Sequence, residues 1–256
     1  MTVRSERDTR GIVRITVARP EVKNAFDDKV IARLSELARS IDGATRAVVL
    51  QSEGDVFCAG ADLEWMKRKA NASREENLAD ARALAGMYAA LADVPAPLVV
   101  RVQGPALGGG AGLVAVADVA IASSAASFAF AEVRVGIVPS VVSPYVVRRL
   151  GAARATALFV TGERFEVRRA YELGLVDRVV APEDLDSAVE ETLAAILASA
   201  PGAVRVAKRL VREVTGRRPE DVRERTVETI ADVRAAEEGR EGFDAFLEKR
   251  PPRWKL

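Results

Sequence analysis

Two glycine-containing stretches have the residue types and spacing that could stabilise an anion. Residues 57–63 read FCAGADL, and residues 103–118 contain three successive glycines at 108–110. Because glycine has no Cβ, the backbone N–H groups around it can approach a ligand closely. Each stretch follows a strand pattern and precedes a helical one, and the first N–H groups of a helix have no partner within it. The pair predicts two donors for an oxygen that becomes negatively charged during a reaction. The alternative is that the glycines serve only close helix–strand packing.

The sequence contains no histidine, which removes several classes of mechanism. Ser-His-Asp and Cys-His nucleophilic sites and the HExxH zinc site all require one. Proton transfer must then fall to Asp, Glu, Tyr, Lys, Cys or water, and no metal site is expected. Neither a GxSxG elbow nor a Walker phosphate loop occurs. The single cysteine, Cys58, excludes an intrachain disulfide and fits a reducing compartment.

The overall composition is typical of a globular enzyme. The 256 residues are 49% hydrophobic and 29% charged, with a formal net charge of +1. Such a chain can bury a sizeable core, and a charge so near zero does not favour nucleic acid or an anionic membrane as a partner. No run of about 20 uncharged apolar residues occurs, and the first residues contain no apolar signal region. We therefore expect a cytoplasmic enzyme that acts on a small molecule.

Strand and helix patterns alternate over the first two thirds of the chain. Strand patterns lie at residues 11–18, 46–51, 97–102, 119–122, 127–130 and 175–180. Helical patterns begin at Asp27 or Asp28, at a capping box of Ser73 and Glu76, after the three glycines, and near Ser143. This alternation is typical of an α/β layer fold.

The last part of the chain changes character. Three helical segments, 182–199, 201–214 and 218–247, are rich in Ala, Arg and Glu. We expect an α/β core domain over residues 1–195 and a helical region over residues 196–256 that is used for subunit contacts.

Taken together, these motifs resemble the enoyl-CoA hydratase/isomerase (crotonase) superfamily over nearly the whole chain. The motifs that carry the resemblance are Arg19-Pro20-Glu21 with Asn24-Ala25, residues 57–63, the glycines at 108–110, Asp118, the series Phe128, Glu132, Gly136 and Pro139, and residues 248–250. The resemblance implies a spiral of ββα units with a C-terminal helical trimerisation region. It also implies homotrimers that often pair into hexamers, a coenzyme A thioester as substrate, and no separate cofactor.

The same resemblance assigns roles to residues of the two glycine stretches. The N–H groups of Ala61 and Gly109 would hold the thioester oxygen, and Glu132 would act as general acid and base, with a pKa raised by burial. Family hydratases usually carry a second glutamate, but this chain has Gly112 there. A site with one carboxylate can move a proton on and off carbon, and it can hydrate if Glu132 and a water share the work. Further substrate contacts are expected at Ala59, Gly60, Asp62, Leu63, Gly108 and Gly112.

Within the superfamily, three segments most resemble bacterial methylglutaconyl-CoA hydratases of leucine and isovalerate breakdown. These are residues 62–68, 73–78 and 143–148. Their substrate has a carboxylate at its far end, so a cation should lie near the acyl pocket. Arg134 is two residues past Glu132, on the same side of an extended segment, and is the expected partner. Lys23 and the tail residues Lys249 and Arg250 are expected at the coenzyme A phosphates, the tail residues from a neighbouring subunit.

Three alternatives remain open. The first is a Δ3-Δ2 enoyl-CoA isomerase or a generic short-chain enoyl-CoA hydratase. The second is a non-catalytic member of the superfamily that only binds acyl-CoA or a protein. The third is a dinucleotide-binding oxidoreductase, because residues 110–115 fit GxGxxA and Glu132 lies 20 residues after Gly112. The glycines of that fingerprint come directly off a strand end, however, whereas residues 103–107 intervene here.

Overall fold

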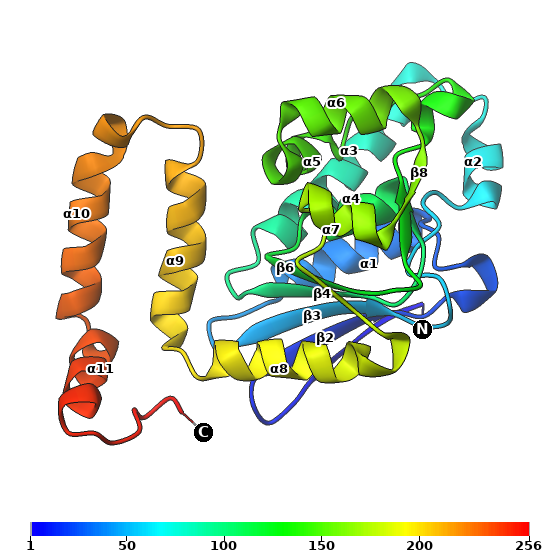
Figure 1. The fold of residues 1–256 in the computed structure, drawn as a ribbon. Coiled ribbons are helices and arrows are strands. Elements are labelled where there is room, and N and C mark those ends of the chain that lie inside the picture. Colours follow the sequence, from blue (N-terminus) through cyan, green and yellow to red (C-terminus); the bar gives the residue numbers. More distant parts are fainter. Residues whose placement is uncertain (1, 256) are drawn as a thin grey trace.

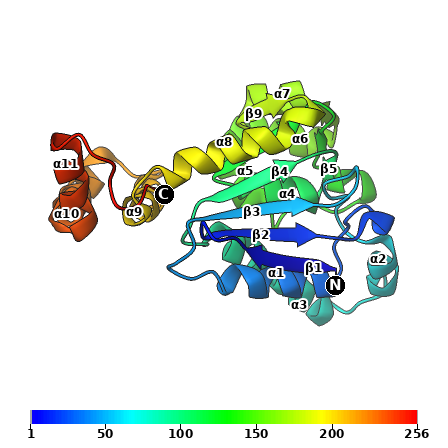
Figure 2. The same cartoon turned by 90° about the horizontal axis from the view of Figure 1, so that it is seen from below.

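The main element of the fold is a six-stranded, mostly parallel sheet. The computed structural model describes residues 2–255. The strand order is β1-β2-β3-β4-β6-β9, and only the β1–β2 pair is antiparallel. The strands are β1 (Val3–Arg7), β2 (Ile12–Val17), β3 (Ala47–Ser52), β4 (Leu98–Val102), β6 (Val119–Ser123) and β9 (Arg178–Val180). Figures 1 and 2 show the sheet between helices on both faces, so the predicted α/β architecture is confirmed.

A second, smaller sheet lies at the edge where the glycine stretches are found. It has the order β5-β7-β8 and consists of β5 (Ala106–Leu107), β7 (Ser127–Ala129) and β8 (Arg164–Glu166). β5 leads directly into the helix of the three glycines. β7 is followed closely by the short 3-10 turn that contains Glu132. This sheet therefore places two sequence-distant segments of the expected site side by side.

Helices cover both faces of the large sheet. Those of the body are α1 (Asp28–Arg39), α2 (Leu63–Lys69), α3 (Arg74–Ala92), α4 (Gly109–Ala115), α5 (Ser143–Leu150), α6 (Ala152–Thr161), α7 (Val167–Leu173) and α8 (Leu185–Leu197). Short 3-10 turns occur at η1 (Pro20–Val22), η2 (Glu132–Val135) and η3 (Pro182–Asp184). Two predicted helix starts are confirmed: Asp27 caps α1, and Ser73 and Glu76 form a capping box at α3. Among residues 2–255, no helix is long and apolar enough to cross a membrane.

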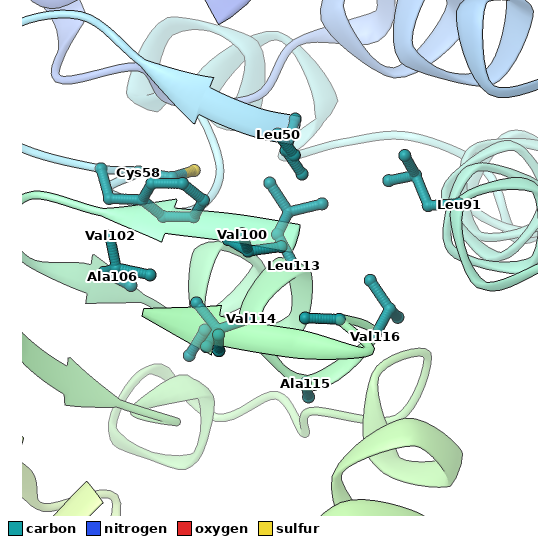
Figure 3. Packing of buried hydrophobic residues seen from close by; sticks show 14 of the residues in the cluster. Leu50, Cys58, Leu91, Val100, Val102, Ala106, Leu113, Val114, Ala115 and Val116 are labelled. Carbon is teal, nitrogen blue, oxygen red and sulfur yellow. The ribbon is translucent and has the colours of Figure 1, made fainter. Parts of the chain in front are cut away.

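The two faces of the sheet belong to two hydrophobic cores. Along β3, Val48 and Leu50 pack in the larger core with α1, α3 and α4, whereas Ala47 and Val49 pack in a smaller core under α8. This division follows from the alternation of side chains across a strand. Figure 3 shows part of the larger core, where Leu50 and Val100 lie close to Leu113 of α4. The buried α4 is thus fixed against the sheet from which the site is built.

The C-terminal helices form a lobe that extends away from the sheet. It consists of α9 (Pro201–Val214), α10 (Pro219–Ala235) and α11 (Glu237–Leu247), and Figures 1 and 2 both show it to one side of the body. The single helix expected over 218–247 is wrong, because Ala236 is extended and breaks it. The break lets the Glu238 carboxylate accept hydrogen bonds from Gly202 N at 2.8 Å and Ala203 N at 3.2 Å, which caps α9.

Two elements were not predicted from the sequence, and a third segment differs from its prediction. β1 is an edge strand that buries only Val3, and α6 buries few side chains, so neither gave a clear periodic pattern. The sequence predicts an extended segment after β7, but this segment forms the 3-10 turn η2.

Candidate active site

The two glycine stretches lie against each other, as the sequence predicted. Residues 57–63 connect β3 to α2 and pair with β5: Leu107 N donates to Cys58 O at 2.9 Å. Gly60 has φ +90°, and a Cβ on it would lie 3.0 Å from Leu107 O and 3.9 Å from Gly109 N. Only glycine adopts this conformation without strain and lets the two backbones approach so closely. The start of α4 is therefore adjacent to residues 60 and 61.

Two backbone N–H groups at this junction have no acceptor within the part of the chain that the structure describes. They belong to Ala61, which is exposed, and to Gly109, the first residue of α4. One neighbour of each is bonded: Asp62 N donates to Phe26 O at 2.7 Å, and Gly108 N donates to Ala129 O at 2.8 Å. The N–H groups of Ala61 and Gly109 are thus available to a ligand oxygen.

The carboxylate of Glu132 lies beside these donors. A Cβ on Gly108 would be 3.1 Å from Glu132 Oε1, so the carboxylate contacts the residue directly before Gly109. The Oε2 atom is buried and has no hydrogen-bond partner among residues 2–255. Burial raises the pKa of Glu132 above its ordinary value of 4.5. A partly desolvated carboxyl with a free oxygen is suited to take and return a proton near neutral pH.

Tyr88 and Phe26 hold the start of α4 from behind. The Tyr88 hydroxyl donates to Gly109 O at 2.7 Å, and a Cβ on Gly109 would lie 2.7 Å from the Phe26 ring. Tyr88 is fully buried, and burial raises its pKa well above the ordinary range, so the phenol stays neutral and donates. Sequence reasoning placed Tyr88 only on the apolar side of its helix, because helical spacing does not reveal a contact with a residue 21 positions away.

At Gly112, where a second carboxylate was missing, other side chains fill the space. A Cβ there would lie 2.5 Å from Val142 Cγ1 and 3.0 Å from the Tyr88 hydroxyl. Such distances leave no room for a side chain unless Val142 moves. Val142 and Tyr88 therefore fill the volume that a side chain at position 112 would need.

A family profile described as enoyl-CoA hydratase/isomerase matches residues 7–256 of the chain. The chain belongs to this family. An enoyl-CoA hydratase of Mycobacterium smegmatis has a solved structure that superposes with a TM-score of 0.94, at 35% identity and with 100% of both chains covered. Pseudomonas aeruginosa AtuE superposes with a TM-score of 0.96, at 34% identity and with 100% of both chains covered.

A more distant relative is the trans-2-decenoyl-[acyl-carrier-protein] isomerase of Streptococcus mutans. It is 27% identical over 249 residues, which cover 95% of this chain and 94% of that one. The full-length structural matches confirm the predicted crotonase-type spiral with its C-terminal helices. The substrates of the enoyl-CoA hydratase/isomerase family are acyl-CoA thioesters.

The remaining residues of the first glycine stretch lie at the same junction. Ala59 N donates to Lys23 O at 3.0 Å, which places the exposed Lys23 beside the stretch. The side chain of Asp62 caps α2 by accepting from Trp65 N at 3.0 Å, and it is also paired with Arg19. Leu63 is 73% exposed. Lys23 is thus an exposed cation beside the first glycine stretch.

Arg134 is not placed as expected. Because η2 is a 3-10 turn with about three residues per turn, residues two apart point in different directions. The expectation that Arg134 and Glu132 share one side of an extended segment is therefore wrong. The Arg134 side chain is exposed and packs against the end of α6, where a Cβ on Gly162 would lie 3.3 Å from its Cγ.

Within one chain, the tail lies far from the glycine junction. Lys249 follows α11 and is exposed, and Figures 1 and 2 show α11 and α2 at opposite ends of the molecule. Arg250 is paired with the buried Glu241 at 2.7 Å, which lowers the pKa of that carboxyl to about 2. Among residues 2–255, no group of three or more His, Cys, Asp or Glu side chains is arranged to hold a metal ion.

Proposed function

We propose that this enzyme is a hydro-lyase that adds water to, or removes it from, the α,β double bond of an enoyl-CoA thioester. The observation that carries the proposal is the junction itself. Two N–H groups without acceptors, from Ala61 and Gly109, lie next to a partly buried carboxylate with a free oxygen. A thioester carbonyl bound by both donors would have its α and β carbons within reach of Glu132.

In the proposed reaction, Glu132 accepts a proton from water as the water oxygen bonds to Cβ. The electron pair of the double bond moves onto the thioester oxygen, which becomes an enolate held by Ala61 and Gly109. The oxygen then returns its electron pair, and Cα takes the proton from the Glu132 carboxyl. Each such donor typically contributes about 10²–10³ in rate. One carboxyl performs both transfers, since position 112 supplies no second one.

A Δ3-Δ2 enoyl-CoA isomerase is the second candidate, and the filled space at Gly112 favours it. In that reaction Glu132 removes a proton from Cα of a 3-enoyl thioester and returns it to Cγ, with the same enolate between the donors. No water has to be activated, so one carboxylate suffices.

For the preferred substrate we propose 3-methylglutaconyl-CoA, which is formed in leucine and isovalerate catabolism. The support is the likeness of residues 62–68, 73–78 and 143–148 to hydratases of that substrate. Arg134 is the cation proposed for the far carboxylate. Its exposed side chain forms no salt bridge among residues 2–255 and packs beside Gly162, so this assignment requires the side chain to turn toward the acyl group when substrate binds.

We propose that the enzyme works in the cytoplasm as a homotrimer or as a hexamer formed by two trimers, without a cofactor beyond the coenzyme A of its substrate. An apolar groove of about 620 Å³ on the C-terminal lobe supports subunit contacts; it is lined by side chains that include Val206, Phe243, Phe246 and Trp254. In such an assembly Lys249 would reach coenzyme A phosphates at a neighbouring subunit's site.

The test is a panel of thioesters assayed in H₂¹⁸O: crotonyl-CoA, 3-methylglutaconyl-CoA and trans-3-hexenoyl-CoA. A hydratase removes the conjugated absorbance of the first two and places ¹⁸O in the product. An isomerase instead creates that absorbance from the third without ¹⁸O. Turnover of 3-methylglutaconyl-CoA that is no faster than that of crotonyl-CoA would contradict the proposed substrate.

A variant of Arg134 tests whether this residue binds the far carboxylate of the substrate. Arg134→Leu should lower kcat/KM for 3-methylglutaconyl-CoA by about tenfold or more, in the range typical of a deleted charge partner, and leave crotonyl-CoA nearly unchanged. Crotonyl-CoA is the matched control, because a folding defect lowers both rates. Equal losses would remove Arg134 from the acyl pocket.

A further inference from the structure

Arg19 connects the two loops that hold the Ala61 peptide. It follows β2, and its side chain is only 12% exposed. The guanidinium donates to Ala25 O at 2.8 Å and lies 3.2 Å from a carboxylate oxygen of Asp27. It also donates to Asp62 Oδ2 at 3.2 Å. One partly buried cation thus bridges Asp27 to Asp62, which lies 43 positions after Arg19.

Both carboxylates in this network are caps of helix N-termini. Asp27 accepts from Val30 N at 2.8 Å at the start of α1, and Asp62 accepts from Trp65 N at 3.0 Å at the start of α2. The Trp65 N–H bond, followed by attraction to Arg19, lowers the pKa of Asp62 below its ordinary value. Asp62 therefore remains ionised at neutral pH, and the guanidinium has two fixed anionic partners.

The bridge between Phe26 and Ala61 lies directly beside these caps. Phe26 N donates to Gly60 O, and Asp62 N donates to Phe26 O, both at 2.7 Å. These two bonds flank Ala61 and leave its own N–H without an acceptor in the described chain. The direction of that N–H consequently depends on how the segment that ends in Asp27 is held against the segment that ends in Asp62.

We infer that Arg19 is a positioning residue that aims the Ala61 N–H at the thioester oxygen by holding Asp27 and Asp62 at a fixed spacing. The inference rests on the proposed function, because it takes Ala61 as a donor to the substrate. Without Arg19, two carboxylates with low exposure would face each other unpaired, and like charges in a poorly solvated site repel. A donor displaced by about 1 Å can cost about 100-fold in rate.

The experiment compares Arg19→Met with Arg149→Met in the full-length protein. Arg149 is a matched control: its side chain is 11% exposed, pairs with Asp177 at 2.6 Å, and donates to Leu175 O at 2.8 Å. It belongs to α5 and also donates to Ala117 O at 2.9 Å, just past the end of α4 that is opposite the glycine junction. Two quantities are measured for each protein. One is kcat and KM with crotonyl-CoA, and the other is the carbonyl stretching frequency of bound butyryl-CoA labelled with ¹³C at the thioester carbon.

Wild type and Arg149→Met should both lower the carbonyl frequency relative to free butyryl-CoA, because two donors polarise the bond. Arg19→Met should lose part of this shift, because the Gly109 N–H remains, and should reduce kcat by about 10- to 100-fold, with KM changed by less than about threefold. Arg19→Lys, which keeps the charge but cannot span both carboxylates, should be intermediate, and it replaces Arg19→Met if that variant does not fold.

Three results would overturn the inference. Arg19 variants with the full frequency shift and a normal kcat would show that Arg19 only stabilises the fold. An equal loss in Arg149→Met would show that the effect comes from general destabilisation. A wild-type protein that binds butyryl-CoA without any shift would refute the donor role of Ala61 and Gly109, and the proposed function would fail with it.

Discussion

At the residue scale, Gly112 separates this enzyme from family hydratases that carry two glutamates. Its Cα faces Val142 and the Tyr88 hydroxyl, which occupy the volume that a side chain would need. The sequence showed that the second glutamate is absent. The structure adds that this space is filled by Val142 and Tyr88, which supports the proposed mechanism with one carboxyl.

Gly112→Glu should therefore lower crotonyl-CoA hydration rather than rescue it. Overpacking a buried site typically costs about 1–3 kcal/mol, and a buried charge without a partner adds to that cost. The measurements are the hydration rate and the Tm of the variant. Gly112→Glu combined with Val142→Ala is the control, because it restores room and should recover part of both. A tenfold faster single variant would show that the pocket accepts the second base.

Glu132 itself should make the fold less stable at neutral pH. Burial raises its pKa in the folded chain above the ordinary 4.5. The folded state thus binds this proton more tightly than the unfolded state, and ionisation weakens folding as the pH rises through the raised pKa.

Glu132→Gln removes that titration, so its Tm should exceed that of wild type at neutral pH and approach it below the ordinary pKa of 4.5. Thermal unfolding across this pH range measures the difference. Glu183→Gln, a change in the exposed turn η3, should show no such dependence. A Glu132→Gln variant that is less stable than wild type at neutral pH would contradict the desolvated environment of Glu132.

At the element scale, the start of α4 supplies both a donor and its alignment. Gly109 is the first residue of that helix, where proline is normally tolerated because the N–H has no helical partner. Here that N–H is the one we assign to the thioester oxygen. Substitution at this position can separate the donor from the packing around it.

Gly109→Pro removes the N–H, whereas Gly109→Ala keeps it; both add a Cβ close to the Phe26 ring. We expect kcat of the proline variant to be lower than that of the alanine variant by a factor of about 10²–10³. Binding of acetoacetyl-CoA, which resembles the enolate, should weaken more than binding of butyryl-CoA. If the two variants behave alike, Gly109 serves packing and not catalysis.

The elements and motifs that could be predicted from the sequence are those with local signals. The capping residues Asp27 and Ser73 predicted where two helices begin. The glycines at 60 and 108–110 predicted the two segments that meet in the structure. Contacts between distant residues left no such signal, so the roles of Tyr88, Val142 and Arg19 emerged only from the fold. The turn at η2 was missed because a four-residue 3-10 segment has too short a period to distinguish from an extended one.

At the scale of the whole molecule, the C-terminal lobe presents apolar side chains that its own body does not cover. Phe246 is 81% exposed and Leu247 is 75% exposed, at the end of α11 in the lobe that extends away from the sheet. Contiguous exposed apolar surface is typical of an interaction site. The proposed trimer would bury this surface and bring Lys249 to a second subunit.

Phe246→Asp should accordingly dissociate the assembly. Light scattering after size-exclusion chromatography should give three or six times the chain mass of 27.4 kDa for wild type and a smaller value for the variant. Tyr171→Asp, which places the same charge on the exposed face of α7, is the control and should leave the mass unchanged. A wild-type protein that runs as a monomer would contradict the proposed assembly.

The most direct test of the central claim is the rate of Glu132→Gln on the best thioester of the panel, measured together with the Kd for butyryl-CoA. The account assigns both proton transfers to this one carboxyl, and the structure provides no second carboxylate at Gly112. We predict that kcat falls by about 10²–10⁴ while Kd changes by less than about threefold, because glutamine keeps the shape and loses the proton chemistry. A variant that retains kcat close to that of wild type would show that Glu132 is not the acid and base, and would contradict the mechanism.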